Sequence, residues 1–313
     1  MVSQFDRYAY VGNIYVHTYR NLFKNDVPLG LDLFTKLKTL FDEQDRFILS
    51  RPPKNIFIKE FELTADRYAE ILFHAIDPSI PDNVLANRND GTLRKAQRKD
   101  DEDPAISAHV LIDLDEKFNQ SREYPALIEN VDYLSRSYIV QFMDAWMDFT
   151  LSEDRLRPGE KATQKYRPTI KFHASPSQTI QNILEAGGVL KGVKYVETQL
   201  EEQTFGDEAY PVIKRKDIGI TVKNRPGGNK AVAMLKSFWE SIRAENPETF
   251  KVIIEDTNHR SKTLKIDTRK NNILSNFFIS QVLLNEFGTP LAMCEENIRR
   301  DVIDKMKSNL PNA

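Results

Sequence analysis

The sequence has a single cysteine, Cys294, among its 313 residues, so the chain cannot form an internal disulfide bond. Its composition therefore gives no sign of an oxidising compartment. No run approaches the roughly 18–20 apolar residues of a membrane-spanning helix, and the first residues, MVSQFDRYAY, lack the pattern of a secretory signal. Glycine and proline, at 12 and 15 residues, are too few for a collagen-like or low-complexity chain. We expect a cytoplasmic protein with a sizeable core.

Signatures of catalysis are missing as well. The chain has no Walker loop, no glycine fingerprint for dinucleotides and no nucleophile elbow. One cysteine is too few for a structural zinc site, and the five histidines are widely spaced: His17, His74, His109, His173 and His259. We therefore predict no catalytic residue, no metal and no cofactor. His109, in an apolar segment, is expected to be packed and hydrogen-bonded, and Cys294 is expected to be buried in a helix without a histidine partner.

Charge is distributed unevenly along the chain. Residues 1–150 carry 18 Lys and Arg against 25 Asp and Glu, whereas residues 151–275 carry 22 against 16, within a net charge of -2. A basic region in a nearly neutral chain indicates an anionic partner, of which nucleic acid is the commonest. The binding surface is therefore expected in the second half of the chain.

Hydrophobic periodicity predicts an α+β fold of mixed, largely antiparallel sheets with flanking helices. Two subdomains are predicted, an acidic one over 1–150 and a basic one over 165–313 that ends in closing helices, joined by a polar linker at 152–164. Strands are predicted at 10–20, 47–50, 55–61, 105–114, 166–172, 192–203, 216–223, 251–256 and 262–267. Helices are predicted at 31–45, 64–75, 124–130, 135–148, 176–185, 230–244, 271–287 and 291–309, with a long connection at 76–103.

Three groups of basic residues are candidates for the binding surface. Lysine, arginine and backbone amides at loops and strand edges contact phosphates without reading bases. Binding should therefore have little sequence preference and strong salt dependence. The candidate nucleic-acid-binding residues are Lys165, Arg167 and Lys171 in the first group, Lys214, Arg215, Lys216, Lys223, Arg225 and Lys230 in the second, and Arg260, Lys262, Lys265, Arg269 and Lys270 in the third.

Two other functions stay open from the residues alone. A metal-dependent nuclease needs clustered carboxylates, which the acidic run 100–103 and the pair Glu255-Asp256 offer, although a run of acids is more typical of a solvated segment. A regulatory protein that binds another protein is the second alternative. Tyr166 and Phe172 lie beside basic residues, as stacking platforms for single strands do, but core packing is the commoner role of such aromatics.

From Asp100 onward, the order of features resembles the RexA-like phage-exclusion proteins of bacterial phage defence. The acidic run 100–103 and Pro104 precede an apolar strand at 105–114, and a basic strand at 167–172 follows. A helix ended by Gly187-Gly188, a Lys-rich helix, a strand pair and two closing helices complete the order. The resemblance implies a cytoplasmic homodimer that binds DNA with little sequence preference. It also implies a role in abortive infection, as a sensor of phage replication that signals to a membrane-protein effector.

Overall fold

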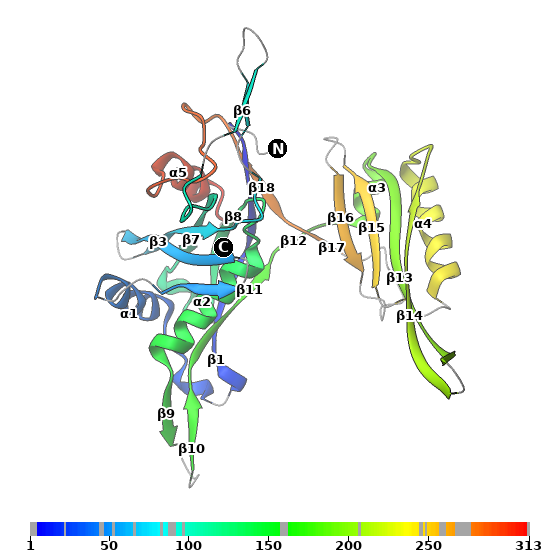
Figure 1. Cartoon of the computed structure of the whole chain (residues 1–313). Coiled ribbons are helices and arrows are strands. Elements are labelled where there is room, and N and C mark those ends of the chain that lie inside the picture. The colour runs from blue at the N-terminus through cyan, green and yellow to red at the C-terminus, as the bar shows by residue number, and fades with distance from the viewer. Residues whose placement is uncertain are drawn as a thin grey trace. The chain divides into compact units, whose positions relative to one another are not determined.

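The chain forms two compact units (Figure 1). Unit 1 comprises Met1–Ser175 and Ser280–Ala313, and unit 2 is the intervening segment Pro176–Ile279. The computed structural model describes residues 5–21, 23–43, 47–51, 54–64, 67–81, 84–86, 92–95, 98–156, 162–205, 208–243, 247, 249–256, 261–266 and 277–311.

Unit 1 is built on an eight-stranded sheet of order β11-β1-β8-β7-β4-β3-β2, in which β18 also pairs with β1. Its strands are β1 (Arg7–Thr18), β2 (Leu49–Arg51), β3 (Lys54–Thr64), β4 (Tyr68–Ile76), β7 (Ala105–Asp113), β8 (Glu123–Asn130), β11 (Pro168–Ala174) and β18 (Gln281–Leu284). Two hairpins stand apart from it: β5 (Val84–Ala86) with β6 (Leu93–Lys95), and β9 (Glu153–Leu156) with β10 (Thr163–Tyr166). The helices are α1 (Gly30–Glu43), α2 (Arg136–Leu151) and α5 (Arg300–Ser308), with short 3-10 turns η1 (Tyr19–Asn21), η2 (Lys24–Asp26) and η3 (Glu116–Phe118).

Both faces of the unit 1 sheet are covered. Successive side chains of a strand point to opposite faces, and the central strands bury side chains on both. On β7, Val110 packs into the core shared with α1 and α2, while the next residue, Leu111, packs against α5 and the segment before it. On β4, Phe73 and Leu72 divide in the same way.

Unit 2 is a four-stranded sheet of order β14-β13-β15-β16 with two helices. Its elements are β12 (Pro176–Thr179), α3 (Ile180–Glu185), β13 (Val189–Phe205), β14 (Glu208–Thr221), α4 (Gly228–Arg243), β15 (Thr249–Glu255), β16 (Ser261–Ile266) and β17 (Phe277–Ile279), of which β12 pairs with β17. Helices α3 and α4 pack on one face of the sheet, against Val193, Val252 and Leu264, which lie opposite one another on β13, β15 and β16. We call the other face the open face.

The α+β fold with largely antiparallel sheets is confirmed, because every strand pair that the structure describes is antiparallel. Two of the predicted helices are wrong. Residues 68–75 lie in β4 and residues 124–130 lie in β8, two largely buried strands, while Thr64 is the last residue of β3. The sequence of a short, largely apolar segment is compatible with a buried strand and with a buried helix. In the structure both segments are strands, because each pairs with β7.

The predicted subdomain boundary differs from the observed units. The predicted linker at 152–164 contains β9 and β10, and Arg155 of this hairpin lies over the Tyr166 ring, 3.6 Å from its centre. The chain instead leaves unit 1 after Ser175 and returns at Ser280, whose amide donates a 2.9 Å hydrogen bond to the Ser175 carbonyl. Unit 2 is thus an insertion, and its two connections carry no linker-like composition.

The predicted closing helices are also corrected. Residues 277–279 and 281–284 are strands, and within 291–309 only Arg300–Ser308 is helical. Residues 271–276 lie outside the described part. Leu284 and Phe287, apolar residues of this region, are buried in the intramolecular core beneath α5. Among the described residues, no helix is long and apolar enough to cross a membrane.

Candidate nucleic-acid interface

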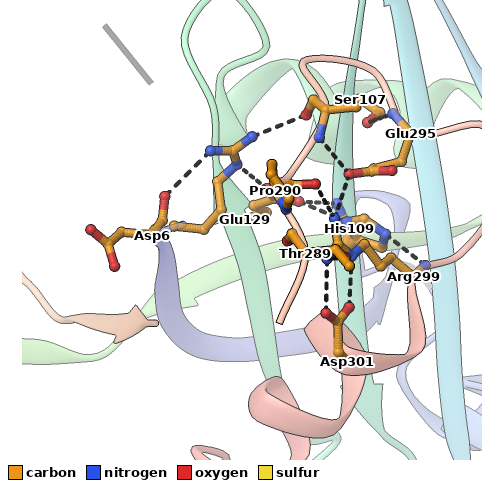
Figure 2. A network of polar contacts seen from close by, with 11 residues as sticks. Asp6, Ser107, His109, Glu129, Thr289, Pro290, Glu295, Arg299 and Asp301 are labelled. Atoms are coloured by element: carbon orange, nitrogen blue, oxygen red, sulfur yellow. Dashed lines mark hydrogen bonds and ion pairs between the residues drawn. The ribbon is translucent and has the colours of Figure 1, made fainter. Parts of the chain in front are cut away.

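The most extensive buried polar network lies in unit 1, where it fastens the C-terminal segment to the sheet (Figure 2). Arg7 Nε and His109 Nδ1 donate to the two carboxylate oxygens of Glu129, at 3.0 and 2.8 Å. The other ring nitrogen, Nε2 of His109, accepts the Arg299 amide at 3.1 Å. Burial opposes ionisation of Glu129, but these hydrogen bonds and the charge of Arg7 outweigh it and lower its pKa. His109 is therefore a packed, hydrogen-bonded residue, as predicted, and the network is structural.

Cys294 differs from its prediction. It lies in a loop, is partly exposed, and has its Sγ 3.7 Å from His74 Nε2. That histidine, 220 residues away in sequence, could not be found from spacing. Burial raises the pKa of the Cys294 thiol, which disfavours the reactive thiolate. His74 Nε2 also lies 2.8 Å from the Glu295 carbonyl oxygen. The pair thus serves to position the loop on β4.

The first predicted basic group is in unit 1, and two of its members are paired within the chain. Asp148 of α2 forms ion pairs with Lys165 at 2.6 Å and with Arg167 at 2.7 Å. Burial of the Asp148 carboxyl would raise its pKa, but these two cations lower it. Lys171 is exposed on β11. Tyr166 packs beneath Arg155, so its ring serves the core and not a stacking platform.

The second group is in unit 2, where the strand geometry divides it. Lys214, Arg215 and Lys216 are exposed neighbours on β14, so their side chains alternate between the two faces of the ribbon. Arg215 lies opposite Thr198 and shares the open face, whereas Lys216 lies opposite Glu197 on the other face. A contiguous basic run on a strand therefore cannot act as one patch.

The remaining predicted residues are distributed around the unit 2 sheet. Lys223 and Arg225 follow β14 and are exposed, and Arg225 Nη1 lies 3.9 Å from Glu255. Lys230 is exposed near the start of α4. Lys262 and Lys265 are on β16, and the latter side chain is exposed on the open face. Arg260, Arg269 and Lys270 lie outside the described residues.

Three lysines meet on the open face, and two of them were missed by the sequence analysis. Lys251 of β15 lies directly opposite Lys194 of β13 on one side and Lys265 of β16 on the other. All three are exposed, and none forms an ion pair within the described part of the chain. We call these residues the lysine row.

The lysine row carries an electrostatic cost. Directly opposite residues of antiparallel strands have Cβ atoms about 4.5–5.5 Å apart, and like charges at that spacing destabilise a sheet. Lys251 has such a neighbour on both sides. An anion bound across the row would remove this repulsion, so the arrangement favours a polyanionic ligand.

The missed lysines gave only a weak signal in the sequence. Lys194 stands between Val193 and Tyr195, and Lys251 between Phe250 and Val252, so strand alternation alone places each on a solvent face. Their alignment with Lys265 depends on the register of three strands, including a bulge between Leu190 and Gly192, which the sequence does not specify.

The acidic candidates do not assemble into a metal-binding group among the described residues. Within the run 100–103, Glu102 and Asp103 form exposed pairs with Lys99 and Arg98. Glu255 pairs with Lys191 at 3.2 Å. These carboxylates thus serve local charge pairing.

No family model, curated protein or solved structure matches the chain.

Proposed function

We propose that unit 2 binds DNA through its phosphate backbone, with the lysine row of the open face as the centre of the contact. The observation that carries this proposal is the row itself: three exposed lysines, aligned across three strands, without an acidic partner among the described residues. Arg215 extends the positive charge along the same face. The ligand supplies the negative charge that these three lysines do not find in an ion pair among the described residues.

The chemistry of these side chains supports binding with little sequence preference. A lysine ammonium is a point charge on a flexible stem, well suited to phosphate and poorly suited to the bidentate reading of a base. Phosphate contacts fix the position of a nucleic acid without carrying sequence information. Each contact releases condensed counterions, so affinity should fall steeply as salt rises.

The resemblance to RexA-like phage-exclusion proteins adds a biological setting to the proposal. In that setting the protein is a cytoplasmic homodimer that senses phage DNA and signals to a membrane-protein effector. The lysine row supplies the DNA contact that such a sensor needs, while the dimer and the effector stay predictions from the resemblance.

Fluorescence anisotropy with two labelled duplexes of unrelated sequence, at two salt concentrations and with or without magnesium, tests the proposal. Lys251→Glu should weaken binding of both duplexes to a similar degree. The slope of log affinity against log salt should fall by about 1 for each lysine–phosphate pairing that a substitution removes. Reversal of all three lysines should abolish binding.

Lys236→Glu is the matched control, because Lys236 is an exposed lysine of α4, on the helical side of the same unit. It should leave affinity nearly unchanged. Equal losses in the two variants, or wild-type affinity of Lys251→Glu at low salt, would contradict the proposal. Magnesium-dependent loss of the duplex would instead support the nuclease alternative.

The two faces of β14 give a second test. Arg215→Glu changes the open face, and Lys216→Glu changes the opposite face. The first substitution should weaken DNA binding more than the second. The reverse order would place the contact on the other side of the sheet.

A further inference from the structure

A hollow lies beside the lysine row on the open face. Its volume is about 330 Å³, close to the lower end of the range of about 300–1,000 Å³ for small-molecule sites. Lys194 and Lys251 line one side, and Asp217 and Gly219 of β14 line the other. Gly219 lies directly opposite Lys194, so the hollow is where a side chain is missing from the row.

The carboxylate of Asp217 is an unexpected neighbour for a phosphate contact. Its side chain is 73% exposed, and its partner, Arg215 Nε, is 3.8 Å away, beyond hydrogen-bond distance. A carboxylate repels phosphate and only accepts hydrogen bonds. The ligand group that meets Asp217 must therefore be a donor, such as a hydroxyl or an amine.

We infer that the hollow takes one unpaired nucleotide, with its phosphate on Lys194 and Lys251 and a sugar hydroxyl or base amine donating to Asp217. This inference rests on the proposed function and adds a feature that duplex binding does not need. In a duplex each base amine uses one N–H group in pairing and presents the other only at a groove edge, and the sugar hydroxyls of DNA are free only at a strand end. We therefore expect the hollow to bind strand ends and unpaired segments more tightly than paired DNA, although the rest of the open face binds DNA of any sequence.

The missing side chain of Gly219 makes a selective test possible. A Cβ added at Gly219 would meet only Lys194 Cγ, at 3.9 Å, which is ordinary contact. Gly219→Leu should thus fold normally while filling the hollow. Thr263→Leu is the matched control, since Thr263 is exposed on the open face, on β16, outside the hollow lining.

Calorimetric titration at low salt with deoxyadenosine monophosphate, deoxyadenosine and inorganic phosphate measures the preference. The wild-type protein should bind the monophosphate about tenfold or more tightly than either fragment. Gly219→Leu should abolish that preference, and Asp217→Asn should weaken monophosphate binding about threefold to tenfold, as expected for one hydrogen bond. Thr263→Leu should bind as the wild type does.

Binding of a covalently closed duplex circle, which has no strand ends, separates the two proposals. If Gly219→Leu and Asp217→Asn keep the affinity for the closed circle but lose the preference for a linear duplex with a single-stranded overhang, the inference is supported. If the monophosphate binds no better than inorganic phosphate while Lys251→Glu still weakens duplex binding, the hollow is not a nucleotide site and the proposed function stands. If the wild type binds no duplex at low salt, both proposals fail.

Discussion

The two units use their sheets in different ways. The unit 1 sheet is covered on both faces, by α1 and α2 on one side and by α5 with its preceding segment on the other. The unit 2 sheet packs α3 and α4 on one face and exposes lysines on the other. The charges differ in the same direction: unit 2 has 16 Lys and Arg against 13 Asp and Glu, a net charge of +3, whereas unit 1 has 28 against 33, a net charge of −5.

The two units also differ in whether these basic side chains form ion pairs within the chain. In unit 1, Arg7 and Arg167 each donate to a carboxylate of a neighbouring element, so their charges serve folding. In unit 2, the lysine row has no such partner among the described residues. These two arginines of unit 1 are therefore paired with carboxylates, whereas the three lysines of the row in unit 2 are exposed and form no ion pair among the described residues.

The largest effect should come from Glu129→Ala in unit 1. It would leave Arg7 and His109 buried without their partner, a loss of about 3–5 kcal/mol. The chain has two tryptophans, Trp146 in unit 1 and Trp239 in unit 2, both buried, so single-tryptophan variants report on each unit during urea unfolding. The urea midpoint reported by Trp146 should fall strongly, and the midpoint reported by Trp239 should change little.

Glu123→Ala provides the control for that measurement, because Glu123 forms an exposed pair with His173. Exposed pairs contribute at most about 1 kcal/mol. If Glu129→Ala lowered the urea midpoint reported by Trp146 no more than Glu123→Ala does, the network would not be what stabilises unit 1.

The next largest effect should be in unit 2, from Gly192→Ala. A Cβ at Gly192 would overlap the carbonyl oxygen of Ile220 on β14, so the strands would have to separate. Overpacking of this kind costs about 1–3 kcal/mol. The urea midpoint reported by Trp239 should fall in Gly192→Ala. Gly219→Ala, in the same sheet, is the control and should leave that midpoint unchanged. Equal decreases in the two variants would argue against the observed register.

A smaller, pH-dependent effect is expected at Asp148. Because its pKa is lowered in the folded protein, its contribution to stability is complete above the ordinary value of 3.8 and is lost as the pH falls through the folded value. Asp148→Asn should therefore destabilise unit 1 at neutral pH, by about 1 kcal/mol or less for a partly exposed cluster. The difference from wild type should disappear in acid, as Trp146 fluorescence across a pH series would measure, and a difference independent of pH would contradict the role of Lys165 and Arg167.

The smallest effect should be a gain in stability. Lys251→Gln removes the central charge of the lysine row and should stabilise unit 2 by a few tenths of a kcal/mol at low salt, about the cost of like charges across a sheet. The gain should fade as salt screens the row. Lys236→Gln should give no such gain, and a destabilised Lys251→Gln protein would show that the row is not under repulsion.

Much of the fold followed from the sequence. The helical spacing in α1, α2 and α4 is a local pattern, so these helices were predicted close to their observed places, whereas the alternation predicted only the second half of β14. Buried runs were less certain, because β4 and β8 are buried on both faces and show no clear alternation of apolar and polar residues. The insertion of unit 2 between Ser175 and Ser280 left no signal, since its connections are short strands and not polar linkers.

By itself the sequence determined the fold class, the packed state of His109 and the excess of positive charge in the second half of the chain, because composition and periodicity are local properties. The tertiary structure alone decided which cations are paired and which stay exposed without an ion pair among the described residues. Lys165 and Arg167 meet Asp148 only through the packing of α2, and Lys194, Lys251 and Lys265 align only through strand register. The physical reason is that a charge acts over a few ångströms of space, and sequence distance does not fix which charges come that close.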